Sequence, residues 1–140
     1  MEPPFPIEVV TMARSFSAQV GEHVSRYERR MSAVRNQAVS DVLEEAQRPV
    51  AQGGRMRVDT GFLRNSLVTD ADGSSAEGAD SYTLVLAGAT ADAEITAAWT
   101  ASYARAREFG ARGQPPDFFA RDAAQRWQEF VQRAADRFRS

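Results

Sequence analysis

The stretch VGEHVSRYERRMSAVRNQAVSDV, residues 20–42, decides the fold. Its apolar side chains recur at alternating intervals of four and three residues, which places them along one face of an α-helix. This stripe comprises Val20, Val24, Tyr27, Met31, Val34 and Ala38, and Val42 continues it. The surrounding residues, 7–47, include one glycine, Gly21, and no proline. They predict either one long amphipathic helix or two shorter helices that meet near Gly21.

An unbroken helix of this length would be too long for the rest of the chain to cover. About 40 residues at 1.5 Å each make a rod of roughly 60 Å, whereas a compact globule of this size is under about 40 Å across. Either the helix breaks near Gly21, or its free end packs on another protein. A coiled coil is the competing interpretation, although the pattern extends over only about three heptads.

The residues that follow, 55–100, change to the alternation that is typical of β-strands. Residues 81–86 and 93–100 alternate in this way, and the short polar segment between them has the length of a hairpin loop. A third strand is expected near residues 66–69. The polar residues 70–80, between this strand and the hairpin, are expected to form a mobile loop. These patterns predict a small antiparallel β-sheet.

The last third of the chain is expected to be helical. A short helix is predicted over residues 102–109, stopped by Gly110, and a longer one over residues 116–138. Phe118 and Phe119 are expected to pack as a staple at the start of the longer helix. The whole chain therefore predicts one domain of the α+β class. Its parts are a long N-terminal helical region (1–48), a β-sheet region (55–100) and the C-terminal helices (101–140), within a single domain (1–140).

The composition excludes several kinds of chemistry. The chain has no cysteine and one histidine, His23, which excludes disulfides, thiol catalysis, cysteine-ligated metals and two-histidine metal motifs. Ser66 and Ser81 lack a histidine base at a strand-to-helix elbow, and Asp70 with Asp72 lacks the further ligands of a calcium loop. We therefore expect no enzyme, no catalytic residue, no metal and no cofactor. Neither a signal peptide nor a membrane-spanning stretch is expected.

Charge is distributed unevenly along the chain. All 17 basic residues are Arg, and with 19 acidic residues the net charge is -2. The absence of Lys has two interpretations, a genome that favours Arg codons or a surface that pairs charges with partner subunits. Residues 1–69 carry +1, residues 70–94 carry -6 and residues 95–140 carry +3. The six acids of the middle block are Asp70, Asp72, Glu77, Asp80, Asp92 and Glu94. Such opposed regions suit contacts between subunits.

Two short signatures stand on either side of the predicted sheet. The first, VDTGFLRNSL at residues 58–67, holds a polar turn in which Gly61 is available for a positive φ. The second is YARAREFG at residues 103–110. Its Tyr103 and Phe109 are expected to anchor the short helix against the sheet, and its final glycine to cap that helix. From residue chemistry alone, both signatures are turns and core anchors.

With these signatures the chain resembles the tail-completion or neck proteins of tailed bacteriophages and related prophage-like particles, and is similar to the minor tail protein Z group. In that family a long N-terminal helix leads to a D-T-G-x-L-x-x-S turn, a small antiparallel sheet, a Y-A-x-x-x-E-F-G motif and a C-terminal helix. The matching residues are Asp59, Thr60, Gly61, Leu63 and Ser66 in the first motif, and Tyr103, Ala104, Glu108, Phe109 and Gly110 in the second. The chain departs from the family at Asp117-Phe118, where Pro-Phe is usual, and at Asp122-Ala123, where Pro-Ala is frequent.

The resemblance implies a structural subunit of the virion, made in the host cytoplasm and placed at the neck between head and tail. Such subunits assemble as a homo-oligomeric ring, expected to be hexameric. The ring joins a portal-side adaptor or stopper protein to a tail terminator or tail-tube protein, and double-stranded DNA passes through it. No membrane is involved. The matching motif residues are expected to serve structure and interfaces.

Two other functions stay open at this point. The chain could be a tail terminator or head-closure stopper of the same machine, or a small toxin-like or enzymatic domain, which the missing cysteines and isolated His23 disfavour. Within a ring, part of the acidic block is expected to face the channel, where like charge would keep DNA from sticking. The residues expected there are Asp70, Asp72 and Asp80.

Overall fold

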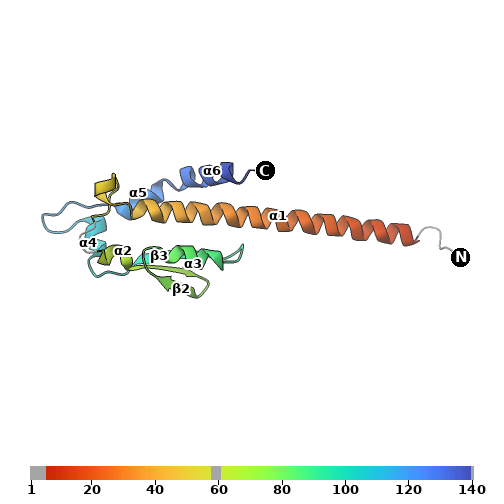
Figure 1. Ribbon diagram of the computed structural model, residues 1–140, viewed down its shortest axis with the longest axis horizontal. Coiled ribbons are helices and arrows are strands. Elements are labelled where there is room, and N and C mark those ends of the chain that lie inside the picture. Colours follow the sequence, from red (N-terminus) through yellow and green to blue (C-terminus); the bar gives the residue numbers. More distant parts are fainter. Residues whose placement is uncertain (1–5, 58–60, 140) are drawn as a thin grey trace.

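The computed structural model describes residues 6–57 and 61–139, with side chains from residue 16 onward. Asp59 and Thr60 of the first motif lie outside the described residues. Helix α1, Pro6–Ala46, is one continuous helix of 41 residues that passes through Gly21 (Figure 1). At 1.5 Å per residue it is about 62 Å long. Of the two arrangements that the sequence allows, the structure therefore has the single long helix.

The sheet has three strands in the order β2-β1-β3, and both pairings are antiparallel. Strand β1 is Leu67–Ala71, β2 is Ser74–Glu77 and β3 is Ile95–Trp99. In the register of β1 with β3, Leu67 lies opposite Trp99. The predicted α+β class, with a long N-terminal helix and a small antiparallel sheet, is confirmed. The expected strands near residues 66–69 and 93–100 are β1 and β3.

Residues 70–80 are not the mobile loop that their polarity predicts. They contain the end of β1, a two-residue turn and the whole of β2. The turn residues Asp72 and Gly73 both have positive φ, 51° and 91°, as in the tight turns whose twist matches a hairpin. Because β2 is short and rich in serine, its sequence carries no apolar alternation that would have indicated a strand.

Residues 81–86 form a helix, so the strand predicted there is wrong. Helix α3 is Ser81–Ala87, and it buries Ser81, Val85 and Leu86 while Leu84 is exposed. The buried positions lie four and five residues after Ser81, as expected for one side of a helix. The sequence did not reveal this, because so short a segment fits the helical period of 3.6 residues and the strand period of two equally well. Ser81 fixes the start of the helix on the sheet, since its Oγ lies 2.9 Å from Thr69 Oγ1.

The short helix before Gly110 is confirmed as α4, Ala104–Phe109. The single helix predicted over residues 116–138 is instead two helices, α5 (Phe119–Gln125) and α6 (Trp127–Arg137), which meet at Arg126. Both pack on α1. A short helix α2, Phe62–Asn65, and a turn of 3₁₀-helix, Val50–Gln52, complete the described elements.

The core has two parts, and both lie at the C-terminal half of α1. In the first, Val34 and Ala38 of α1 pack against Phe130 and Ala134 of α6. The second joins the loop after α1 to the other short helices, through Met56, Leu63, Ala104 and Phe119. Trp99 of β3 meets the Phe119 ring edge to face, with the ring centroids 5.1 Å apart. Beyond this body α1 projects on its own toward the N-terminus (Figure 1).

Candidate assembly surface

The projecting part of α1 carries an uncovered apolar surface. The stripe that the sequence predicts is divided, because Val34 and Ala38 are buried whereas its N-terminal members are exposed. Exposure ranges from 46% at Val20 to 67% at Phe16, which lies beside the stripe. We call the exposed set the free stripe, and it consists of Phe16, Val20, Val24, Tyr27 and Met31.

Helix α6 determines where the free stripe begins. It lies on α1 in the opposite direction, since Arg126 at its start bonds to Glu45 while Arg137 at its end donates to Gln37 Oε1. After Arg137 the helix ends, and Phe138 packs as the last apolar residue against the cluster around Val34. The free stripe therefore continues the surface that α6 covers, one helical turn beyond the point where α6 stops.

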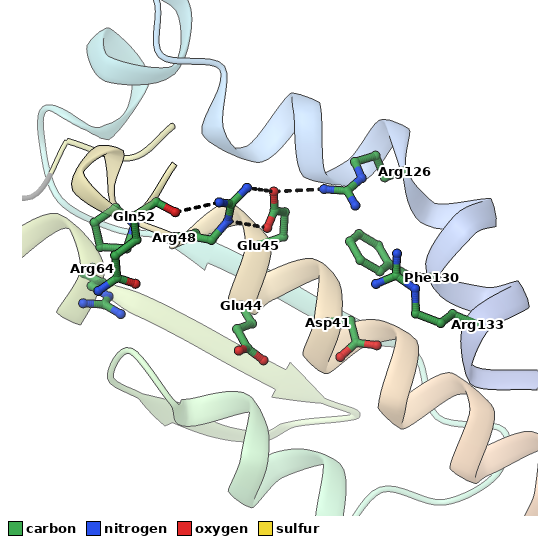
Figure 2. A pocket seen from close by; sticks show the side chains of 10 residues that line it. Asp41, Glu44, Glu45, Arg48, Gln52, Arg64, Arg126, Phe130 and Arg133 are labelled. Carbon is green, nitrogen blue, oxygen red and sulfur yellow. Dashed lines mark hydrogen bonds and ion pairs between the residues drawn. The ribbon is translucent and has the colours of Figure 1, made fainter. Parts of the chain in front are cut away.

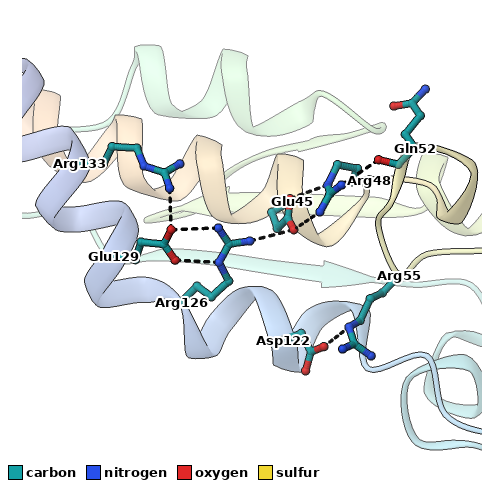
Figure 3. Close-up of polar contacts among 8 residues, drawn as sticks. All are labelled: Glu45, Arg48, Gln52, Arg55, Asp122, Arg126, Glu129 and Arg133. Carbon is teal, nitrogen blue, oxygen red and sulfur yellow. Dashed lines mark hydrogen bonds and ion pairs between the residues drawn. The ribbon is translucent and has the colours of Figure 1, made fainter.

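A chain of ion pairs locks α6 onto α1 (Figure 3). Arg48 binds Glu45 through two hydrogen bonds of 2.8 and 2.7 Å, and Arg126 bonds to the same carboxylate at 2.9 Å. Arg126 also makes two hydrogen bonds to Glu129, which accepts a third from Arg133 at 2.6 Å. Bidentate pairs of this kind are the stronger class of surface ion pair. The i,i+3 and i,i+4 spacing of the local pairs could have predicted them. The bond that joins the two helices, Arg126 to Glu45, has no such signal, because 81 positions separate the two residues.

The hollow beside these ion pairs, of about 300 Å³, is lined mostly by charged side chains (Figure 2). Three of its four arginines, Arg48, Arg126 and Arg133, are already bound to Glu45 and Glu129, whereas Arg64 Nε is buried without a hydrogen-bond partner among the described residues. Burying a ligand there would compete with these bonds. The ion pairs that line the hollow therefore support the packing of α6 on α1.

Acid is expected to weaken the ion pairs of Glu45 that hold α6 on α1. Hydrogen bonds and charge from Arg48, with the charge of Arg126, hold the pKa of Glu45 below its ordinary value of 4.5. Because the folded-state pKa is the lower one, the stabilisation is present above about pH 4.5 and is lost as the pH falls through the folded-state value. The thermal unfolding midpoint of Glu45→Gln should therefore fall less than that of the wild type between about pH 6 and pH 3. An equal fall would contradict the assignment, and Glu94→Gln, an exposed side chain, is the matched control.

The described residues of the first motif have structural roles. Gly61 has the positive φ that its position predicts, 82°, and precedes α2. Leu63 is buried in the core. Ser66 is buried too, and its Oγ donates to Leu63 O at 2.6 Å. Its carbonyl oxygen accepts from Thr100, from both the backbone N–H and the hydroxyl, at 3.0 Å each. This motif therefore ties α2 to the segment that follows β3.

In the second motif, Glu108 makes the main structural contact. The sequence analysis lists this residue in the motif but does not predict the contact. Glu108 is buried on α4, and its carboxylate accepts the backbone N–H groups of Ala120 and Arg121, at 3.0 and 2.9 Å. It thereby caps the first turn of α5. Gly110 adopts φ 87° and ψ 160°, and its Cα lies against Pro116, where a Cβ would come within 3.2 Å of the ring.

The two aromatic residues of that motif do not both anchor the helix. Phe109 is 61% exposed and Tyr103 39% exposed, so the expectation that they pack α4 on the sheet is wrong. Buried Ala104 takes that place. Of the expected staple, Phe119 enters the core, whereas Phe118 has a positive φ of 52° and lies under the Arg121 guanidinium.

The acidic residues proposed for a channel fall into two places. Asp70 and Asp72 lie at the hairpin end of β1, where Asp72 Oδ1 accepts from Glu94 N at 3.4 Å. Asp80 lies near the other end of β1. It follows Gly78 by two residues, and Gly78 N donates to the carbonyl oxygen of Leu67, the first residue of β1, at 2.8 Å. Four steps of a strand separate these ends by about 13 Å. The acidic block is therefore two clusters.

Within residues 6–57 and 61–139, no group of three His, Cys, Asp or Glu side chains is placed to hold a metal ion. No helix in the same part of the chain is long and apolar enough to cross a membrane. His23 lies exposed on the projecting part of α1, whereas Ser66 and Ser81 are buried in the body, so the structure does not bring a histidine to either serine.

No family model matches the chain, and no curated protein or solved structure shows significant similarity to it. The fold and the free stripe by themselves define an α+β body that carries a projecting helix with an uncovered apolar face.

Proposed function

We propose that this protein is a structural subunit that assembles with copies of itself, and is not an enzyme. The observation that carries the proposal is the free stripe on the projecting part of α1. Residues 6–31 extend for about 39 Å, and in their described part large apolar side chains stay open to water. Soluble monomers rarely expose a continuous apolar patch of more than a few hundred Å², and larger patches mark interaction sites.

The size of the free stripe suits a contact between subunits. Its five side chains expose on the order of 400–500 Å². Each partner in a stable interface of standard size buries about 800 Å². The free stripe therefore supplies roughly half of such a contact, and the polar residues beside it would supply the rest.

The assembly that we propose is a ring at the neck of a tailed phage or phage-like particle, with six copies as the expected number. Support comes from the family resemblance in the two motifs and from the order of the elements, a long helix, a turn, a small antiparallel sheet, a short helix and C-terminal helices. The described motif residues brace the body, as a scaffold subunit requires. The ring would join a portal-side adaptor or stopper to a tail terminator or tail-tube protein.

Binding to purified head and tail proteins tests this role. The full chain, immobilised, is expected to retain both a portal-side protein and a tail terminator or tail-tube protein. Retention of tail-tube protein alone would instead indicate a tail terminator, and retention of portal-side protein alone a head-closure stopper. Retention of neither contradicts a neck function.

In a ring, Asp70 and Asp72 are the acids that we place toward the channel, because they share one end of the sheet with Glu94. Reversing both to Arg would replace repulsion of DNA by attraction. Particles carrying Asp70→Arg/Asp72→Arg are expected to assemble normally and to deliver DNA more slowly, measured as the rate of genome ejection. The control Asp70→Asn/Asp72→Asn, which introduces no attraction, should be less affected. Ejection at the normal rate in the reversed variant would contradict a channel position.

A further inference from the structure

We propose that the free stripe binds the acidic outer face of α3 on a second copy of this chain, so that the assembly is head to tail. This inference rests on the proposed function only in taking the protein to be a self-assembling subunit. It adds which two surfaces meet and excludes a symmetric pairing of two stripes.

Helix α6 obstructs the symmetric pairing. It already covers the continuation of the free stripe at Val34 and Ala38. If two copies paired their stripes in parallel, the two α6 helices would occupy the same space between the two α1 helices. If they paired in antiparallel, residues 6–15 of each α1, about 15 Å of helix, would run into the other copy's α6. The stripe therefore fits a different surface, which makes the contact heterologous.

The outer face of α3 offers a complementary apolar contact. Leu84 is 75% exposed, more than any other large apolar side chain described. Thr83 and Ala87 beside it are exposed as well, whereas the opposite side of α3 is buried on the sheet. Leu84 is thus an apolar anchor without cover in the described chain.

Acidic side chains lie on both sides of α3. Glu77 and Asp80 precede the helix in the chain, and Asp80 lies one turn before Leu84 on the same side. Asp41 and Glu44 of α1 instead approach Tyr82, on the side of α3 opposite Leu84. None of these four carboxylates forms a salt bridge with a residue in the part of the chain that the structure describes. Burial raises the pKa of Tyr82 on α3, and the charges of Glu44, Asp80 and Asp41 raise it further, with Arg64 opposing. The face is therefore negatively charged.

The projecting helix has the opposite sign. Residues 16–31 carry three Arg and two Glu. Arg26 pairs with Glu22 on the side away from the stripe. By helical position His23 and Arg30 stand along one edge of the stripe and Glu28 along the other. An apolar stripe on a segment of net charge +1 thus faces an apolar anchor in a region without any basic residue, 70–94, which favours this partner over a second stripe of the same sign.

Two variants that each damage one surface test the arrangement. Val20→Glu/Tyr27→Glu places two carboxylates in the free stripe. Asp80→Arg/Leu84→Arg changes the α3 face. All four positions are exposed, so both variants should keep the circular dichroism of the wild type. For each variant alone, the dissociation constant of self-association is expected to rise at least about 100-fold. Each variant should therefore sediment as a monomer.

A matched control separates the position of the new charges from their number. Ala18 and Ser25 are exposed on α1, seven residues apart like Val20 and Tyr27. By helical position they lie on the side of α1 opposite the free stripe. Ala18→Glu/Ser25→Glu therefore adds the same two charges at the same spacing, and it should assemble as the wild type does.

The mixture of the two damaged variants gives the decisive result. Each retains the surface that the other lacks, so equal amounts should form a 1:1 heterodimer and nothing larger, seen by native mass spectrometry. A mixture that stays monomeric, or a stripe variant that assembles like the wild type, would overturn the inference. Binding of portal-side and tail proteins is read separately. Head-to-tail assembly without that binding would overturn the neck function and leave this contact standing.

Discussion

Replacing Glu108 by Ala is expected to lower the free energy of unfolding by about 3 kcal/mol. The buried carboxylate accepts the backbone N–H groups of Ala120 and Arg121, which no earlier carbonyl in α5 can accept. In the variant both donors lose their partner in a site that water reaches poorly. The backbone link from Phe118 N to Glu108 O, 3.1 Å, would remain but would hold an uncapped helix.

Urea denaturation followed by circular dichroism measures this loss. Glu108→Gln, which keeps one acceptor oxygen of the same reach, should fall between the wild type and Glu108→Ala. Glu94→Ala removes an exposed carboxylate and should change stability by less than about 0.5 kcal/mol. A loss below about 1 kcal/mol for Glu108→Ala would mean that the cap contributes little.

The second large effect is expected at Gly54. A Cβ there would lie 1.8 Å from the carbonyl oxygen of Arg48 and 2.4 Å from its carbon, closer than any non-bonded contact allows. Both clashing atoms are backbone, so the turn itself must open. That turn is closed by Gly54 N donating to Pro49 O at 2.9 Å, and it leads to Met56, which is fully buried in the core. Gly54→Ala is therefore expected to cost at least about 3 kcal/mol.

Gly21→Ala is the matched control for that substitution. Gly21 lies inside α1 with nothing within 4 Å of the added methyl group, and Ala favours a helix over Gly by about 1 kcal/mol. Gly21→Ala should leave the unfolding midpoint unchanged or higher and increase the helical signal. If Gly54→Ala unfolded at the wild-type urea concentration, the close approach of the two backbone segments would be refuted.

The helical stripe was predictable because seven apolar residues repeat in phase over many turns, whereas the sequence left open whether the helix breaks near Gly21. Helix α3 was not, because a seven-residue segment fits a strand and a helix equally well, and the contact of Ser81 with Thr69 that decides between them is tertiary. The hairpin at Asp72 and Gly73 was missed for a related reason, since β2 is held by pairing with β1 rather than by its own side chains.

Only the existence of the free stripe was predictable from the sequence, and its limits were not. The sequence indicates the apolar face and shows that a helix of this length exceeds the body, but it does not say which part of the face stays open. That part is determined by where α6 ends, after the contact of Arg137 with Gln37, a pair 100 positions apart in the chain. The exposed position of Phe109 was not predictable either, because burial of an aromatic side chain depends on what the fold brings near it.

The mass of the wild-type chain in solution tests the central claim most directly. Sedimentation or native mass spectrometry of the full 140-residue chain, over a wide range of concentration, is expected to give a closed assembly of one defined copy number above two, since head-to-tail contacts form a ring when their rotation closes. A chain that stays monomeric at every concentration, or that stops at a symmetric dimer, would contradict the account.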